Sequence, residues 1–246
     1  MNGSDEPPSC RNSIRSMGRF ALGRRLLTLV SSLMMGRPPP STVHIIGDAY
    51  LDVIAKIREL PRWDGDTSIY DPIETVAGGS ALNTAVQMQA LLDSRRQRPE
   101  PGGRRSPIRR CVLHSLIGSD VYGDLIATQL RAAGVTLSAP RVGAQGVCIC
   151  LSGARDRAFV SYKGSVAALQ ASDLDLRALL APGATHVHFA AFIDCAGLQR
   201  DVPRLVQRAT ELGATTSLVP QSDAGEGGRS LLQPISDPVL WGAQWC

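Results

Sequence analysis

The feature that most restricts the fold of this 246-residue chain is an alternation of short apolar runs with longer helical segments. The apolar runs occupy residues 43–52, 111–118, 185–192 and 214–220, and the helical segments occupy residues 80–93, 119–135, 173–180 and 201–213. Strands that alternate with helices in this way form a mostly parallel sheet with helices on both faces. The sequence therefore predicts an α/β fold.

Two stretches depart from this alternation. Residues 53–76 resolve only into short, half-exposed strands separated by turns. Residues 146–163 contain two strand-like runs joined by a short turn, which is typical of a β-hairpin. We expect both stretches to lie outside the parallel sheet.

Polar and glycine residues gather where strands of this sheet should end. Asp52 ends the first apolar run, and the pair Gly78–Gly79 precedes the helix that carries Asn83. Parallel sheets bind ligands at the carboxyl ends of their strands. Glycines allow a ligand to approach the backbone and expose amide N–H groups at a helix start. A carboxylate accepts hydrogen bonds from hydroxyls, and a carboxamide both donates and accepts them.

These four residues predict a site for a neutral polyol. Two simpler interpretations remain open at this point. The glycines alone could serve a tight turn before the helix, and Asp52 alone could be an exposed turn residue.

Three ordered motifs give the sequence a family resemblance. They are GDAYLD at 47–52, AGGSALN at 77–83 and IGSDVYGD at 117–124. Together they resemble the PfkB, or ribokinase-like, carbohydrate kinases. Asp52 matches the sugar-binding Asp of the first family motif, and the second matches Gly-Gly-x-x-x-Asn at Gly78, Gly79 and Asn83. The third matches Gly-x-Asp-x-x-Gly, at Gly118, Asp120 and Gly123.

The resemblance covers residues 43 to about 235 and implies a ribokinase-like three-layer sandwich with a small β lid. The lid would comprise about 53–76 and 146–163. The implied activity is ATP-dependent phosphorylation of a sugar or nucleoside hydroxyl, with ATP and Mg²⁺ as cofactors. Asp52, Gly78, Gly79 and Asn83 would contact the substrate, and a homodimer would form through the lid.

The sequence departs from the family in its C-terminal half. Family members carry Asn-x-x-Glu and Gly-Ala-Gly-Asp motifs there, but no Asn follows Asn83 and no Gly-x-Gly-Asp occurs. We therefore expect a C-terminally truncated fold, a divergent tail at 236–246, no catalytic residue and no turnover. The alternative is a non-catalytic sugar-binding or dimerisation module. The family also often places a polar residue at the end of the strand 185–192, where this chain has Phe192.

Charge is concentrated at the N-terminus. Residues 1–40 hold six Arg and two acidic residues, which accounts for the whole net charge of +4. The remainder is balanced, so nucleic acid is not an expected partner. We expect residues 1–42 to be a disordered or targeting extension of a cytoplasmic protein or, alternatively, an organellar one. Residues 94–110, with seven Arg, read as a surface loop.

Membrane, metal and dinucleotide sites are not predicted. The longest uncharged run of the extension, 26–36, is about half a bilayer span. The six Cys show neither CxxC nor zinc-finger spacing, so Cys148 and Cys150 are interpreted as reduced core residues rather than metal or disulfide partners. No GxGxxG follows a strand, which argues against a dinucleotide enzyme.

Overall fold

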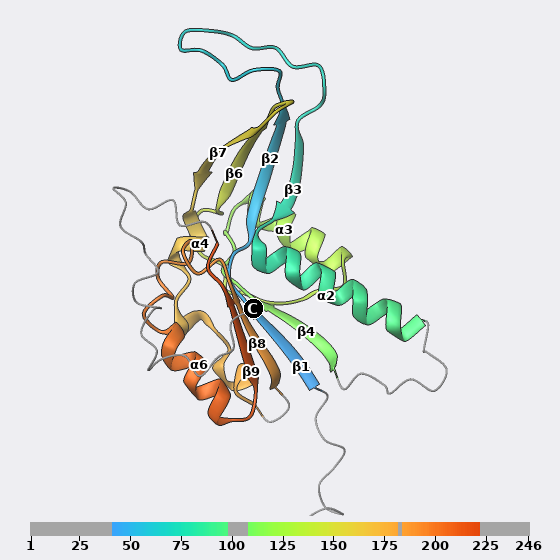
Figure 1. Cartoon of the computed structure of the whole chain (residues 1–246), viewed down its shortest axis with the longest axis vertical. Helices are drawn as coiled ribbons and strands as arrows, with labels where there is room; N and C mark the ends of the chain where they lie inside the picture. The colour runs from blue at the N-terminus through green and yellow to red at the C-terminus, as the bar shows by residue number, and fades with distance from the viewer. Residues whose placement is uncertain (1–40, 98–107, 182–183, 222–246) are drawn as a thin grey trace, which may run out of the picture. The chain divides into compact units, whose positions relative to one another are not determined.

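The computed structural model describes residues 41–97, 108–181 and 184–221. These residues form two β-sheets and the helices that pack on them (Figure 1). The predicted extension up to residue 40, the tail at 236–246 and the central part of the Arg-rich loop lie outside the described residues. Residues 41 and 42 already belong to the first strand.

The main sheet has five parallel strands in the order β5-β4-β1-β8-β9. Its strands are β1 (Ser41–Ile46), β4 (Ile108–His114), β5 (Thr136–Ser138), β8 (Ala184–Ala190) and β9 (Thr215–Val219). The predicted parallel sheet is confirmed, with small shifts of the strand ends. The three-residue strand β5 was not predicted, because three residues are too few to show a period.

Helices cover both faces of this sheet and complete the three layers (Figure 1). They are α2 (Ser80–Gln97), α3 (Val121–Ala132), α4 (Gly164–Ala168), the 3-10 helix η1 (Ala171–Asp173), α5 (Leu176–Leu179) and α6 (Val202–Glu211). Side chains of β1 alternate between two cores. Val43 and Ile45 pack in the core that α2 and α3 cover, whereas Ile46 joins the core that α6 covers. We call this sheet and its helices the body.

The four predicted helices are observed with different starts or lengths; α2, for example, continues to Gln97 instead of ending at residue 93. The helix predicted at 119–135 is observed as α3, and its N-cap is Asp120, whose carboxylate accepts a hydrogen bond from the Gly123 amide. A carboxylate is the stronger acceptor for an amide at a positive helix end. Gly134 follows the end of α3 in the left-handed conformation, with φ of 71°. The helix predicted at 173–180 shortens to α5.

A second sheet of four strands, the lid, has the order β3-β2-β6-β7. Its strands are β2 (Tyr50–Lys56), β3 (Glu74–Gly78), β6 (Val147–Ser152) and β7 (Arg157–Tyr162). The predicted hairpin is confirmed as the antiparallel pair β6–β7. Most lid residues are half-buried or exposed, unlike the buried carboxyl-terminal parts of β1, β4 and β8.

The run 43–52, which was predicted as one strand, is divided between the two sheets. β1 ends at Ile46, Gly47 turns the chain at φ 153°, and β2 begins at Tyr50. All residues from 43 to 51 are buried, including the segment 47–49 that connects β1 to β2. In the sequence the two strands therefore look like one continuous buried strand. Asp52 therefore lies inside the lid strand β2. The prediction that it stands at the carboxyl end of the first parallel strand is wrong.

No helix within these described ranges is long and apolar enough to cross a membrane.

Candidate functional site

A cavity of about 650 Å³ lies between the lid and the carboxyl ends of the body strands. This size is typical of small-molecule sites. The cavity is lined by Asp48, Tyr50, Asp52, Gly79, Ser80, Asn83, Thr84, Cys148, Phe159, Ser161, Lys163, Asp194 and Gln221. Three of the four predicted site residues thus line one cavity, and Gly78 lies directly behind it.

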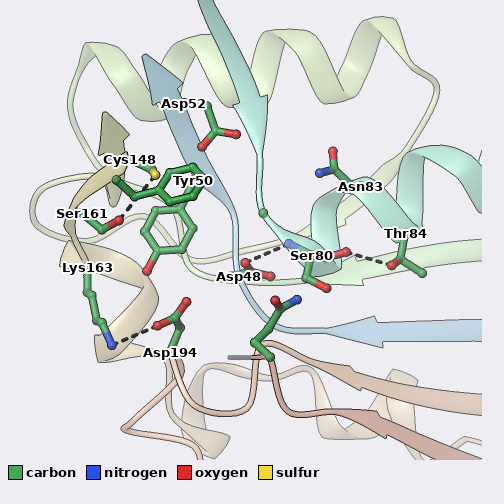
Figure 2. A pocket seen from close by; sticks show the side chains of 13 residues that line it. Asp48, Tyr50, Asp52, Ser80, Asn83, Thr84, Cys148, Ser161, Lys163 and Asp194 are labelled. Atoms are coloured by element: carbon green, nitrogen blue, oxygen red, sulfur yellow. Dashed lines mark hydrogen bonds and ion pairs between the residues drawn. The ribbon is translucent and has the colours of Figure 1, made fainter. Parts of the chain in front are cut away.

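Asp48 anchors the first turn of α2. Its carboxylate accepts hydrogen bonds from the amides of Ser80 (2.8 Å) and Ala81 (2.7 Å) (Figure 2). Gly79, at φ 103°, makes the turn that brings these amides to the carboxylate. Burial raises the pKa of Asp48, and the two backbone hydrogen bonds oppose that shift.

The amides at this helix start were expected to face a ligand. The structure corrects that expectation, because the Ser80 and Ala81 amides are already donated to Asp48. The Asn83 amide is also bonded within the chain, to the carbonyl of Gly79. The Gly-Gly pair therefore shapes the pocket wall, and the amides of Ser80, Ala81 and Asn83 are not free to bind a ligand.

Asp52 approaches the cavity from the lid. Within the described residues, no group donates a hydrogen bond to its carboxylate, and burial raises its pKa. Gly78 makes this position possible, because a Cβ at Gly78 would overlap the Asp52 carboxylate. The two motifs thus meet at the lid. The first motif supplies the Asp52 carboxylate, and Gly78 of the second motif leaves the space for it.

Asn83 lies one turn into α2, on the same side of the cavity as Asp52 (Figure 2). Its side chain is exposed and makes no hydrogen bond to the described part of the chain. A carboxylate acceptor and a carboxamide donor and acceptor therefore face the cavity with free hydrogen-bonding capacity.

The opposite wall contains three polar residues that the sequence did not predict. Lys163, which follows β7, forms an ion pair of 2.9 Å with Asp194, which follows β8. The Tyr50 ring lies beside them, with its hydroxyl toward this pair (Figure 2). That hydroxyl is buried without a hydrogen-bond partner in the described residues. Burial and then the charges of Asp194 and Asp48 raise the pKa of Tyr50, so the phenol stays protonated.

Signals for these residues were available in part. Asp48 and Tyr50 stand inside the first motif, and Asp194 follows the strand end at which Phe192 seemed to replace a polar residue. Phe192 is buried in the core, and Asp194, two residues later, reaches the cavity.

Cys148 contributes a less polar part of the wall. Its Sγ accepts a hydrogen bond of 3.4 Å from the Ser161 hydroxyl, and burial raises the pKa of the thiol. Cys148 and Cys150 are free thiols on a half-buried lid strand, as expected for reduced cysteines. Cys148 packs against the body core that α6 covers, but neither residue is fully buried in it. Among the described residues all cysteines are free thiols, Cys111 and Cys195 being the buried ones.

The third motif lies away from the cavity and braces the crossover into the lid. Asp120 accepts a second hydrogen bond from the Gln145 amide (2.9 Å), while the Gln145 carboxamide accepts one from the Gly118 amide (2.8 Å). The same carboxamide donates to the carbonyl of Ala49 (2.6 Å). The motif therefore fixes the segment between β1 and β2 that carries Asp48.

The cofactors implied by the resemblance find no matching donor set in the described ranges. These ranges contain no group of three or more His, Cys, Asp or Glu residues arranged to hold a metal ion. The lysine that lines the cavity, Lys163, is paired with Asp194. No transfer step is derived from the described residues.

Comparison with known proteins gives one family. The sequence profile of the pfkB family carbohydrate kinases matches residues 41–238. No curated protein sequence matches the chain.

Several solved structures are similar. Ribokinase from Giardia lamblia is 20% identical with a TM-score of 0.58, over 74% of this chain and 55% of that one. Ribokinase from Arabidopsis thaliana, complexed with ribose and ATP, is 20% identical with a TM-score of 0.58, over 75% and 55%. Fructokinase from Xylella fastidiosa is 19% identical with a TM-score of 0.55, over 73% and 50%. The predicted ribokinase-like fold is confirmed, and the chain spans about half the length of these structures.

Proposed function

Because the chain belongs to the pfkB family of carbohydrate kinases, we propose that its pocket binds the hydroxyl groups of a sugar or nucleoside. The observation that carries this proposal is the pairing of two unsatisfied groups on one cavity. The carboxylate of Asp52 and the carboxamide of Asn83 both face it without partners in the described residues. The pair matches a polyol, whose hydroxyls both donate and accept.

Each predicted residue has a separate role in this proposal. Asp52 accepts hydrogen bonds from ligand hydroxyls, and Asn83 donates to or accepts from another hydroxyl. Gly78 leaves the space that Asp52 occupies. Gly79 turns the chain so that Asp48 can hold α2 in place.

Phosphorylation is a separate question from binding. A similar fructokinase structure contains bound ATP, and ATP-dependent phosphorylation of a hydroxyl is the activity that the family name suggests. Transfer needs a base at the hydroxyl and a set of groups that stabilise the phosphoryl charge. We propose that a polypeptide of these 246 residues binds the sugar without phosphorylating it, since its sequence holds no Gly-x-Gly-Asp.

Calorimetry with a panel of neutral pentoses, hexoses and nucleosides tests the binding. We expect at least one ligand with millimolar or tighter affinity, weakened at least about tenfold in Asp52→Ala. Asp156→Ala is the matched control, because Asp156 lies in the lid turn outside the cavity lining. Absence of binding to every ligand would refute the proposal. Turnover with ATP and Mg²⁺ that Asp52→Ala abolishes would refute only the proposed lack of phosphorylation.

The alternative, a dimerisation module, is favoured by one surface of the lid. Ile149 and Val160 are paired neighbours on its outer face, and Tyr162 lies on the same face. They are 40%, 61% and 60% exposed. Contiguous exposed apolar side chains are typical of an interface. We propose that a second copy of the chain covers them.

Sedimentation of the purified chain tests this dimer. The wild type should sediment as a dimer, and Val160→Glu should shift it to a monomer. Leu212→Glu, at an exposed apolar residue after α6, should leave the dimer intact. A monomeric wild type contradicts the proposal.

A further inference from the structure

The charged groups of the pocket suggest which substrates it accepts. Among the described residues, its lining includes three carboxylates, Asp48, Asp52 and Asp194, and one cation, Lys163. Building on the proposed sugar binding, we propose that the pocket selects sugars or nucleosides without an anionic group and rejects their phosphate esters, through the Lys163–Asp194 ion pair.

The first reason is that the pocket's lysine is already neutralised. Lys163 Nζ lies 2.9 Å from Asp194 Oδ1. A lysine binds a phosphate as a point charge, so an opposite charge in contact with it removes most of that attraction. A phosphate that entered here would have to displace Asp194 and leave its carboxylate unpaired.

The second reason is that the helix start is neutralised as well. The N-terminus of an α-helix is a common anion site because its amides point at the ligand. In this chain the Ser80 and Ala81 amides point at Asp48 instead. A lysine and a helix N-terminus, which proteins commonly use to bind a phosphate, thus both lie at the pocket. Lys163 is paired with Asp194, and the helix amides donate to Asp48.

The third reason is that the groups left free in the pocket suit an uncharged ligand. Asp52 is an acceptor with no donor in the described residues, so it calls for a hydroxyl and repels an anion. The Tyr50 hydroxyl and the Asn83 carboxamide are neutral donors. Tyr50 lines the cavity and is only 6% exposed, and its hydroxyl has no partner in the described residues.

Arg157, in β7, is a second cation close to Lys163 in the sequence and serves as a control for it. Its guanidinium stacks 5.5 Å from the centre of the Phe159 ring, and Arg157 itself does not line the cavity. It therefore offers a control for the role of Lys163, since both are lid cations and only one is paired with Asp194.

Calorimetry on matched ligand pairs tests the inference in the full chain. The pairs are ribose and ribose 5-phosphate, fructose and fructose 6-phosphate, and uridine and uridine monophosphate. In the wild type each neutral ligand that binds should do so at least about tenfold more tightly than its phosphate ester. Raising the salt concentration should reduce this ratio, because salt screens the repulsion.

Asp194→Asn should release Lys163 and reduce the ratio by about tenfold. Adding Lys163→Gln to that variant should restore the wild-type ratio, whereas adding Arg157→Gln should not. Asp156→Asn serves as the isosteric control, and thermal unfolding checks that each variant folds.

A wild type that binds phosphate esters as tightly as neutral ligands overturns the inference and leaves the proposed sugar binding intact. A ratio that Asp194→Asn does not change overturns the role of the ion pair and, with it, the inference. A chain that binds neither member of any pair fails the proposed function itself.

Discussion

Asp48, which holds the start of α2 in the body, and Asp52, in the lid, line the same pocket but differ in their hydrogen bonds. Asp48 is 4% exposed and accepts hydrogen bonds from two backbone amides. Asp52 is half-buried and accepts none from the described residues. The body therefore satisfies its buried charge internally, whereas the lid leaves its charge free for a ligand. We infer that stability resides mainly in the first carboxylate and binding in the second.

Removing each carboxylate should separate these two roles and give the largest effect. Asp48→Ala leaves the Ser80 and Ala81 amides buried without an acceptor, which should lower the free energy of unfolding by about 4 kcal/mol. Asp52→Ala should lower it by less than about 1 kcal/mol. Urea unfolding followed by circular dichroism measures both.

Asp48→Asn, which keeps one acceptor oxygen, should give an intermediate loss. Equal destabilisation by Asp48→Ala and Asp52→Ala would contradict the division between body and lid.

Acid should act on the body, because all four histidines of the chain lie in its strands. His44 Nδ1 and His114 Nε2 are 2.8 Å apart, and burial lowers the pKa of each to about 4. The nearby Arg110 adds to this shift at His44, while Asp175 opposes it at both rings. Burial also lowers the pKa of His186 and His188.

A histidine with a lowered pKa is protonated first in the unfolded chain. Stability should therefore be complete above pH 6.5 and fall as the pH drops from 6.5 toward 4. We expect a loss of at least about 3 kcal/mol between pH 7 and pH 4 from the pair. The raised pKa values of Asp48 and Asp52 act in the opposite direction as those carboxylates titrate.

Urea unfolding at several pH values measures this slope. The double variant His44→Leu/His114→Leu should have a shallower slope than the wild type. A slope that the double variant leaves unchanged would assign the acid sensitivity to other groups.

The body was more predictable from the sequence than the lid, for physical reasons. The body strands β1, β4 and β8 are buried toward their carboxyl ends and read as apolar runs, so their order along the chain was clear. The start of β2 was missed because the crossover from Gly47 to Tyr50 is as buried as the strand before it. The hairpin β6–β7 was predicted correctly, because a short turn between two strand-like runs is enough to indicate a β-hairpin.

The site was predictable where its residues belong to short motifs. Asp52 stands in the motif at 47–52, Gly79 and Asn83 stand in the motif at 77–83, and all three line the cavity. Lys163 and Asp194 belong to neither motif and meet only in the folded chain, so no sequence pattern indicated their ion pair. The proposal that the helix amides face a ligand failed because the acceptor, Asp48, lies on a different strand connection.

Gly78→Ala should affect the lid wall of the pocket and leave the body unchanged. The added Cβ would overlap the Asp52 carboxylate, and the side chain of Asp52 can rotate away from it. We therefore expect sugar affinity to fall about tenfold, with a change in unfolding free energy below about 1 kcal/mol. Calorimetry and urea unfolding measure the two quantities.

Gly153→Ala is the control, because Gly153 lies in the lid hairpin turn outside the cavity lining. Unchanged affinity in Gly78→Ala would mean that Asp52 does not need its observed position to bind a sugar.

The rate at which each cysteine is modified compares the lid and the body at single residues, and we expect its changes to be the smallest of these effects. Cys148 and Cys150 of the lid are half-buried, whereas Cys111 and Cys195 of the body are buried. Iodoacetamide should modify the lid thiols first and the body thiols only under unfolding conditions, as peptide mass mapping at each cysteine would show. Burial raises the pKa of Cys148, so its modification rate should increase as the pH rises above 9.0, the value of an ordinary thiol.

A bound sugar should slow the modification of Cys148 by about two- to fivefold, since Cys148 lines the cavity, and leave the rates at Cys111 and Cys195 unchanged. Reaction of the buried body cysteines at the rate of Cys148 would show that the body opens as readily as the lid. In that case the two regions would differ in their hydrogen bonds but not in their stability, and Asp48 would not be the residue that separates them.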